Sequence, residues 1–386
     1  MQRCPVCSSN LVSPFLLRGS VPVHQNLVMV DRISALEINR GSLSLAVCED
    51  CGFIFNADFD GSKLSYGKDY DNSQTYSPSF ESYISELARS LIYDKNVQNC
   101  SIVEVGCGNG SFLRKLVESE EWGNQGYGFD PSYVGEETIL DGRLKFEKRY
   151  YDSECANIHA DVVVCRHAIE HIPDPLSLLF SVRQALVHSP NARVFFETPC
   201  VEWILRNQVI WDFFYEHCSY FTAESLATAF EVSGFQVKSV DHIFQGQYLW
   251  LEATIPSVEP AVTKQPALIS TLAKQFATSE RELLNKWEIK IQKLANQGKV
   301  ALWGAGAKGV TFANLIDPDR KWIDCIIDLN PNKQGKYIPG AAHPIVSYQD
   351  IANREITTAI LMNPNYYQEN LVLLKASNLN IDLLVE

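Results

Sequence analysis

The sequence predicts an α/β protein built around a doubly wound, mostly parallel sheet and flanked by two smaller domains. From about residue 98, short apolar runs alternate with amphipathic stretches, the pattern of strands joined by covering helices. A second strand–loop–helix unit begins near residue 298, and 386 residues are too many for one ordinary core. We expect five segments: a metal-binding domain at 1–57, a connector with a helix at 58–97, the main α/β core at 98–255, a linker and long helix at 256–297, and a Rossmann-like domain at 298–386.

The core shows its strands and helices in alternating order. Expected strands are "SIVEVG", "QGYGFD", "ADVVVCR" and "ARVFFETP", and expected helices are "GSFLRKLVES", "DPLSLLFSVRQALVH" and "AESLATAFEVSGF". Gly234 is placed to end the last helix as a C-cap glycine. "QVKSVDH" and "QYLWLEAT" resemble a hairpin, which predicts an antiparallel strand at one edge of the sheet.

Composition excludes several classes of function. A net charge of −13 argues against nucleic acid as a partner, because a phosphate backbone calls for a basic face. No apolar run approaches the ~20 residues of a membrane span. The start "MQRCPVCSSN" lacks the apolar core of a signal peptide, so we expect a cytoplasmic protein acting on a small molecule. Nothing in the sequence indicates an oligomeric state.

The cysteine pattern predicts a structural metal site. Eleven cysteines, an odd number in a chain without an export signal, do not suggest a disulfide framework. Four of them form two CxxC pairs, which supply four thiolates for tetrahedral zinc and leave no open position for a substrate. The predicted ligands are Cys4, Cys7, Cys48 and Cys51.

The stretch "VEVGCGNGSF" (103–112) places Gly106, Gly108 and Gly110 between a strand and a helix. Such glycines let the backbone turn sharply and approach a ligand, and the helix start offers free N–H groups. The pattern is neither GxGxxG nor a phosphate-binding loop with Lys-Ser/Thr. It resembles the first motif of class I S-adenosylmethionine (SAM) methyltransferases, which implies that Glu104 and the glycines line the cofactor site. Asp130, at the end of the next strand, is placed to bond ribose hydroxyls.

The segment "CRHAIEHIPDP" (165–175) follows the third strand, at the sheet edge that lines the ligand crevice in such folds. We expect Arg166 and His167 to face the cofactor and His171 to have a pocket or structural role. His167 and His171 are four residues apart, a zinc-ligand spacing. No HExxH pattern and no obvious third ligand accompany them.

The segment "WGAGAKGV" (303–310) is a true GxGxxG, formed by Gly304, Gly306 and Gly309, with Lys308 inside the loop. Asp328 follows Gly306 by 22 residues, as in a dinucleotide site. The remaining ~90 residues are enough for half of such a fold only. We therefore favour binding of the phosphates of a nucleotide-linked substrate by loop N–H groups and Lys308.

The stretch "WDFFYEHCSYFT" (211–222) sets Glu216 beside His217 in aromatic surroundings. Burial of either group without a partner is costly, so the two are either a satisfied structural pair or part of a site. The rest of the sequence decides between these interpretations.

Taken together, the motifs resemble the sugar C-methyltransferases that act on deoxysugar nucleotides. The stretches that carry the resemblance are the two CxxC pairs, "VPVHQN" (21–26), "VEVGCGNG", "YEHCSYF", "WGAGAKG" and "IDLNPNKQGKYIPG" (327–340). The resemblance covers nearly the whole chain. It implies a zinc-binding domain, a SAM-binding core and a C-terminal Rossmann-like domain.

The resemblance also implies roles for individual residues. His217 would act as the base that forms an enolate of a keto-sugar, and Glu216 would orient it or stabilise the resulting imidazolium. His171 or a tyrosine hydroxyl would donate a hydrogen bond to the developing enolate oxygen. The family usually has Tyr-His before Glu-His, whereas this chain has Phe214 and Tyr215. Further tyrosines expected at the site, as catalytic or substrate-binding groups, are Tyr76, Tyr70, Tyr215 and Tyr220.

Three other functions remain open from the sequence. The same core motifs suit a methyltransferase that acts on oxygen or nitrogen of another metabolite. The C-terminal GxGxxG suits an NAD-dependent oxidoreductase. A scaffold that binds SAM without turnover is a third alternative, although Glu104, Asp130 and the Glu216–His217 pair argue against it.

Overall fold

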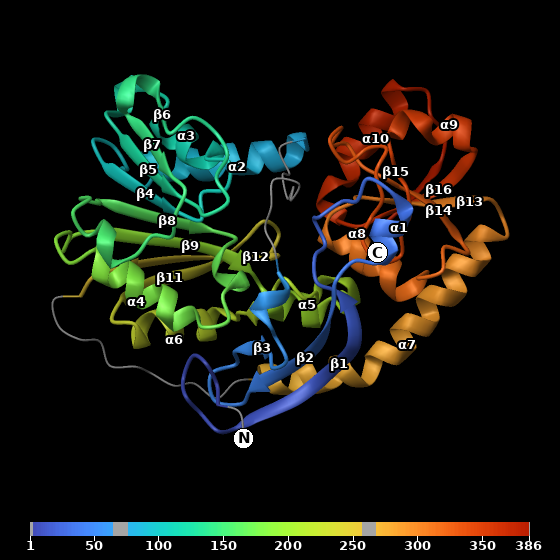
Figure 1. Ribbon diagram of the computed structural model, residues 1–386, viewed down its shortest axis with the longest axis horizontal. Helices are drawn as coiled ribbons and strands as arrows, with labels where there is room; N and C mark the ends of the chain where they lie inside the picture. The colour runs from blue at the N-terminus through green and yellow to red at the C-terminus, as the bar shows by residue number, and fades with distance from the viewer. Residues whose placement is uncertain (1–2, 65–75, 257–267, 386) are drawn as a thin grey trace.

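The computed structural model describes residues 3–64, 76–256 and 268–385, which are arranged around three sheets (Figure 1). The largest sheet has the strand order β11-β12-β9-β8-β4-β5-β7-β6. Its strands are β4 (Ser101–Val105), β5 (Gln125–Phe129), β6 (Thr138–Ile139), β7 (Leu144–Glu147), β8 (Val162–Arg166), β9 (Arg193–Pro199), β11 (Gln236–Ile243) and β12 (Tyr248–Thr254). Strands β7, β5, β4, β8 and β9 run parallel, which confirms the predicted doubly wound α/β class.

Helices cover both faces of this sheet, and successive strand residues alternate between the two cores. Ile102 packs with the helices α2 and α3, whereas its neighbour Val103 packs with α4 and α6. These helices are α2 (Pro78–Tyr93), α3 (Ser111–Val117), α4 (Pro175–Ala185) and α6 (Ala223–Val232). Gly234, with φ +83°, follows α6 as predicted. A strand buried on both faces explains the near-continuous apolar runs.

The edge of the sheet differs from the sequence-based expectation. Strand β12 is antiparallel to β9, as predicted, but it lies one place inside the edge, and β11 forms the edge itself. At the other edge, β7 and the two-residue β6 were not predicted, since "LKFE" and "TI" are too short for a periodicity to emerge.

The N-terminal sheet contains a strand that comes from far along the chain. Its order is β1 (Val12–Pro22), β2 (Arg40–Cys48), β3 (Ile54–Asn56) and β10 (Ser219–Tyr220). In β10, Ser219 pairs with Phe55 and Tyr220 pairs with Ile54, antiparallel. The segment just after His217 is therefore an edge strand of the N-terminal sheet.

The C-terminal sheet has five parallel strands in the order β15-β14-β13-β16-β17. They are β13 (Lys299–Trp303), β14 (Ile323–Ile327), β15 (Ile345–Val346), β16 (Ile356–Leu361) and β17 (Asp382–Leu384), with helices α8 (Ala307–Ile316), α9 (Ile351–Arg354) and α10 (Tyr367–Ala376). This arrangement agrees with the smaller α/β unit expected after residue 298.

The long helix α7 (Ile269–Ala295) joins the parts of the molecule (Figure 1). It contacts β1 and β2 of the N-terminal sheet, α8 and β13 of the C-terminal unit, and α5 (Val201–Arg206) of the core. The short helix α1 (Arg32–Leu36) completes the N-terminal part. None of the helices in the described ranges is long and apolar enough to span a membrane.

Candidate active site

The glycine turn after β4 has the geometry that its sequence predicts. Gly106, Gly108 and Gly110 all have left-handed φ values, +71°, +55° and +75°. A Cβ on Gly110 would lie 2.3 Å from the Phe146 ring, so both the backbone angle and the space require glycine there. The carboxylate of Asp130 accepts a hydrogen bond from the Gly108 N–H at 2.9 Å, which brings the predicted ribose-binding acid to the turn.

Glu104 lies beneath this turn and is only 3% exposed. It accepts a hydrogen bond from the backbone N–H of Leu113 in α3 at 3.2 Å. Burial raises the pKa of Glu104 to about 8, and Arg166 partly offsets this effect. The acid therefore ties the strand to the helix that follows the turn.

Arg166 and His167 belong to a buried network at the carboxyl end of β8. The Arg166 Nε donates to Glu197 Oε2 at 2.5 Å, and the His167 Nε2 lies 3.1 Å from Glu197 Oε1. Tyr83 from α2 donates to the same carboxylate at 2.7 Å. Burial would raise the pKa of Glu197, but Arg166 and His167 outweigh burial and bring this pKa to about 2. Neither Glu197 nor Tyr83 is predicted from the sequence, because neither belongs to a motif.

Arg166 retains an unused donor. Its guanidinium lies over the ring of Phe112 in α3, 4.5 Å from the centroid, directly behind the glycine turn. The Nη2 atom is buried and has no hydrogen-bond partner within the described residues. A buried donor of this kind needs an acceptor, and a carboxylate of a bound cofactor would supply one. The residues present therefore fit SAM.

His171, in the turn after β8, and His217, just before β10, face each other. Their ring centroids are 4.8 Å apart and the rings are nearly perpendicular. Phe214 packs against His217 with centroids 4.2 Å apart. Burial, together with neighbouring histidines and the ammonium of Lys308, holds the pKa of His217 well below its usual range. The imidazole is therefore neutral near pH 7.

Glu216 does not contact His217, which corrects the expected pairing. Its carboxylate lies 3.1 Å from His24 Nδ1 and accepts the Gln25 backbone N–H at 2.8 Å. Glu216 lies in a turn, from which its side chain reaches His24 and Gln25 of the N-terminal domain, while the ring of His217 faces His171. The partner His24 lies in "VPVHQN", a stretch that the sequence analysis singled out without giving its histidine a role.

The tyrosines predicted at the site have different surroundings. The Tyr215 hydroxyl bonds the backbone N–H and carbonyl of Asp60, so it points into the N-terminal domain. The Tyr220 hydroxyl bonds the backbone of Phe214, although its ring lies 6.1 Å from that of His217. Tyr76 is 40% exposed and accepts a hydrogen bond from Asn332 at 3.4 Å. Tyr70 lies outside the described residues.

The glycine loop of the C-terminal unit packs tightly and lies beside the ammonium groups of two lysines. A Cβ on Gly309 would lie 1.9 Å from the Gly304 carbonyl oxygen, so glycine is required for α8 to start there. Lys308 Nζ pairs with Asp212 Oδ2 of the core at 2.5 Å and lies over the Trp203 ring. Gly306 begins α8. The loop of the C-terminal unit thus contacts the core through Lys308.

A second acid and a second lysine complete this loop. Asp328 accepts the backbone N–H of Ala305 at 2.7 Å, so it closes the loop of the C-terminal unit. Lys333, only 4% exposed, donates to the Ala305 carbonyl at 3.1 Å. Among the described residues, no carboxylate is paired with Lys333.

The four predicted metal ligands lie together at one end of the N-terminal sheet. Cys4 and Cys51 have sulfur atoms 3.6 Å apart, and those of Cys7 and Cys48 are 3.5 Å apart. All four sulfur atoms lie within 4.8 Å of one another, and none forms a disulfide. Four thiolates around a tetrahedral zinc ion are separated by about 3.8 Å. The cluster is compatible with zinc.

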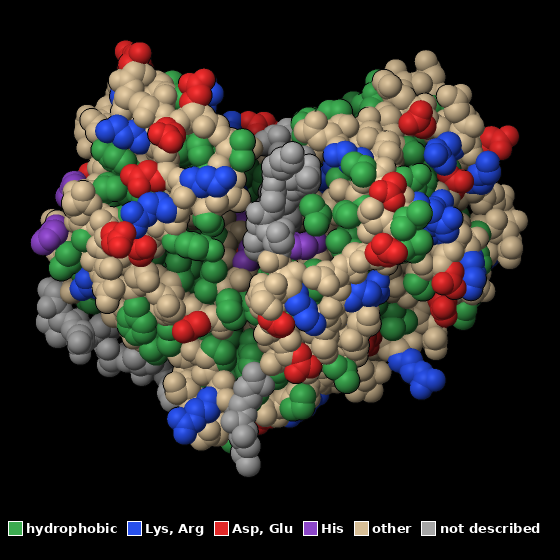
Figure 2. Space-filling model, viewed as in Figure 1, with side chains coloured by type: hydrophobic (Ala, Val, Ile, Leu, Met, Phe, Trp, Pro, Cys, Tyr) green, Lys and Arg blue, Asp and Glu red, His purple; other side chains and the backbone are tan. Residues whose placement is uncertain are grey.

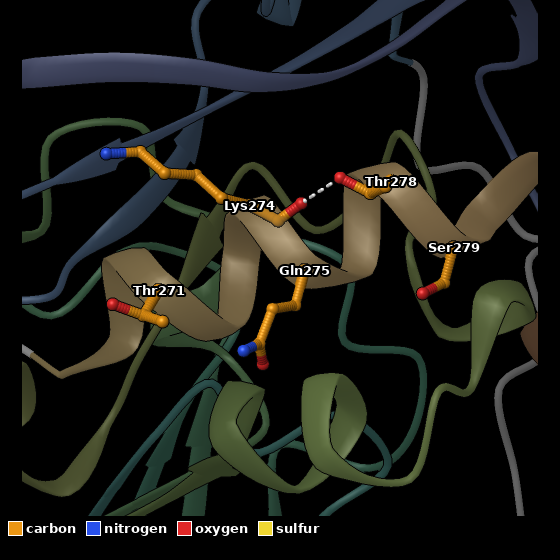
Figure 3. Close-up of a pocket in the computed structure, with 5 residues that line it drawn as sticks. All are labelled: Thr271, Lys274, Gln275, Thr278 and Ser279. Atoms are coloured by element: carbon orange, nitrogen blue, oxygen red, sulfur yellow. Dashed lines mark hydrogen bonds between the residues drawn. The ribbon is translucent and has the colours of Figure 1, made fainter.

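A surface hollow of about 370 Å³ lies elsewhere, on one face of α7 (Figure 3). It is lined by Thr271, Lys274, Gln275, Thr278 and Ser279. Its one charged group, Lys274, pairs with Glu49. A single polar helix face without converging groups has no feature of an active site. Figure 2 shows a different hollow, between the two halves of the molecule, in which histidine side chains are visible. Converging polar groups in a hollow are a feature of active sites.

Comparison with known proteins finds matches to methyltransferases. Residues 78–240 match the model of a methyltransferase domain, and residues 259–377 match that of a C-methyltransferase C-terminal domain. The C-methyltransferase NovU of Streptomyces niveus is 29% identical over 291 residues, which are 69% of this chain and 67% of that protein.

Two other methyltransferases match smaller shares of the chain. The ubiquinone biosynthesis O-methyltransferase of Salmonella paratyphi A is 30% identical over 124 residues, 30% of this chain and about half (47%) of that protein's length. The solved 1,6-didemethyltoxoflavin-N1-methyltransferase of Burkholderia thailandensis, with bound S-adenosylhomocysteine, aligns with 46% of this chain and 81% of its own at 14% identity and a TM-score of 0.35.

The chain is a SAM-dependent methyltransferase, as its methyltransferase domain and its relatives show. Within that class, the C-terminal domain match and the NovU relative support a C-methyltransferase.

Proposed function

We propose that the protein transfers the methyl group of SAM to a carbon atom of a nucleotide-linked keto-deoxysugar, with His217 as the base. SAM, when bound, supplies an electrophilic methyl group. A carbon nucleophile arises when a C–H beside a ketone loses its proton, because the electron pair is then shared with the carbonyl oxygen as an enolate. A 4-keto sugar has such a C–H at carbon 3.

The observation that carries this proposal is the position of His217. Its ring packs against Phe214 and faces His171. His171 belongs to the turn after β8, which pairs with β4, the strand that leads into the cofactor turn. An imidazole held in this way can take the proton from carbon, and apolar neighbours exclude competing water. The Nδ1 of His171 lies 3.0 Å from the Glu216 carbonyl oxygen, a bond that orients its ring toward His217.

Two features support a substrate with phosphate groups. The start of α8 presents backbone N–H groups, and the ammonium groups of Lys308 and Lys333 lie at the same loop. The lack of a carboxylate partner for Lys333 in the described part of the chain favours an anionic ligand beside it.

Replacing His217 tests the base. We expect His217→Asn to reduce methyl transfer by 10²-fold or more, the usual effect of losing a general base, and to leave SAM affinity within about twofold of wild type. Radiolabelled methyl transfer and calorimetric SAM titration measure the two effects. His188→Asn, at an exposed position, is the matched control. Near-normal turnover in His217→Asn removes the assignment.

A substrate panel separates carbon methylation from the alternative that the Salmonella relative suggests, methylation of oxygen. Mass spectrometry with 4-keto deoxysugar nucleotides, and with the same nucleotides reduced at carbon 4, is the measurement. We expect a methylated product only from the keto compounds. Methylation of the reduced sugars would instead indicate an O-methyltransferase.

We also propose that the cluster of Cys4, Cys7, Cys48 and Cys51 holds a structural zinc ion. Cys48→Ser is expected to abolish the bound zinc and lower the melting temperature, because binding of a structural metal contributes directly to folding free energy. Elemental analysis and thermal unfolding measure both, with Cys100→Ser, outside the cluster, as the control. A zinc-free variant with normal stability and activity would contradict the proposal.

A further inference from the structure

Glu170, His171 and His217 form a compact group that base catalysis alone does not require. Glu170 and His171 belong to the short helical turn at Ile169–His171, and His217 faces them from the loop before β10. One potential ligand atom from each residue lies within 4.8 Å of the other two. We propose that this group binds a first-row divalent metal ion such as Zn²⁺, Co²⁺ or Ni²⁺, and that the bound ion switches methyl transfer off.

The donor set suits such ions. Two imidazole nitrogens and one carboxylate oxygen are the ligands of many three-residue sites for zinc and neighbouring metals. Bonds of about 2.1 Å in tetrahedral geometry separate the donors by about 3.4 Å. The present separations, all within 4.8 Å, therefore need a closure of at most about 1.4 Å, which small side-chain rotations can supply.

Hydrogen bonds from behind hold two of the three ligands in place. His171 Nδ1 lies 3.0 Å from the Glu216 carbonyl, which can only accept, so Nδ1 carries the proton and Nε2 carries the lone pair. The carboxylate of Glu170 lies 3.2 Å from His167 Nδ1 and accepts a bond from Thr198 Oγ1 at 3.1 Å. Such supporting partners are typical of metal-binding histidines and carboxylates.

The group is also accessible. Glu170 is buried, but both histidines are only partly buried. Three protein ligands leave a coordination position for water, so an ion can enter and leave on the side of the partly buried histidines.

The inhibitory effect rests on the proposed function. An imidazole whose lone pair is bonded to a metal ion cannot accept a proton from the substrate. Ion occupancy and turnover are therefore mutually exclusive if His217 is the base. Metal binding itself does not depend on that role.

The binding test uses the full-length protein with its cysteine cluster loaded. Cobalt(II) is titrated in, and uptake is measured by equilibrium dialysis and visible absorption. We expect wild type and His188→Asn to bind one equivalent more than Glu170→Gln and His171→Asn. Asparagine at 171 retains a donor for the Glu216 carbonyl, and SAM titration confirms that each variant is folded. Equal uptake by wild type and both variants overturns the site.

The activity test follows methyl transfer at increasing free cobalt. We expect the lost fraction of wild-type activity to match the extra occupancy and to return when EDTA removes the weaker-bound ion. Unchanged or increased activity at full occupancy overturns the inhibitory role. These outcomes are distinct from failure of the proposed function, which is read from His217→Asn without added metal.

Discussion

Glu216 and His24 are joined across 192 residues of sequence, and both are almost fully buried. Glu216 precedes His217 in the sequence, but its carboxylate contacts His24 of the N-terminal domain. We propose that Glu216 influences catalysis by fixing the loop that carries His217, and not by touching the imidazole itself. We regard it as a positioning residue.

Replacing either partner should have the same consequence. Glu216→Ala removes the acceptor of the Gln25 N–H and the Glu216 contact of His24, which costs about 1–3 kcal/mol of unfolding free energy. Chemical denaturation of Glu216→Ala, His24→Ala and the double variant measures the coupling. We expect the double variant to lose at least about 0.5 kcal/mol less than the sum of the single losses.

Kinetics separate this positioning role from the direct one that the sequence suggested. Glu216→Ala should lower kcat without changing SAM affinity, and Glu216→Gln, which keeps an acceptor for the Gln25 N–H, should recover much of the loss. A normal kcat in His24→Ala together with a collapsed kcat in Glu216→Ala would instead favour direct action on His217.

The sequence indicated the glycines and most of the titratable residues described above, but few of the residues to which they form hydrogen bonds. The glycines and Asp130 meet at one turn because the carboxyl ends of neighbouring parallel strands share one sheet edge. Glu197, Tyr83 and His24 escaped prediction because their roles come from contacts between distant segments. No local pattern encodes a partner 100 or more residues away.

At the scale of elements, the start of α8 depends on a close approach of two backbones. Gly309 packs against the Gly304 carbonyl, so the first turn of the helix sits directly on the loop. The third glycine of a GxGxxG motif has this packing role in dinucleotide folds as well. The motif therefore does not by itself indicate NAD.

A single methyl group tests this packing. Gly309→Ala should lower the free energy of unfolding by about 2 kcal/mol, because the added Cβ must displace backbone. Gly19→Ala, where nothing lies within 4 Å, should change it by less than about 0.5 kcal/mol. Thermal and urea unfolding measure both. Equal stability of the two variants would contradict the close contact.

Strand and helix prediction succeeded where segments were long and periodic. The core strands, α6 with its glycine cap and the hairpin of β11 and β12 are examples. The two-residue strands β6 and β10 carry too few residues to show a period, so only their neighbours in space define them.

At the scale of the whole molecule, Arg18 connects three parts. From β1 it donates to the carbonyls of Ile210 and Phe213 in the core, at 2.6 and 2.9 Å. It also pairs with Glu280 of α7 at 2.7 Å. The guanidinium is almost fully buried, so each of its bonds is made away from water.

Removing this guanidinium should weaken the joint between the parts. Arg18→Ala leaves Glu280 and two carbonyls without their donor, and breaking a buried ion pair costs about 3–5 kcal/mol. The exposed pair of Lys274 and Glu49 is the control, and Lys274→Ala should cost less than about 1 kcal/mol. Unfolding by urea compares them. A mild effect in Arg18→Ala would show that the joint is held by apolar packing alone.

The two-residue strand β10 bears on how this protein can be divided. An excised methyltransferase core would retain His217 but lose β3, the strand that pairs with β10 just after His217. Engineers who trim the chain to its SAM-binding portion should therefore recover a fragment that still captures the cofactor and yet turns over slowly. Supplying residues 1–57 as a separate polypeptide is the natural way to restore it.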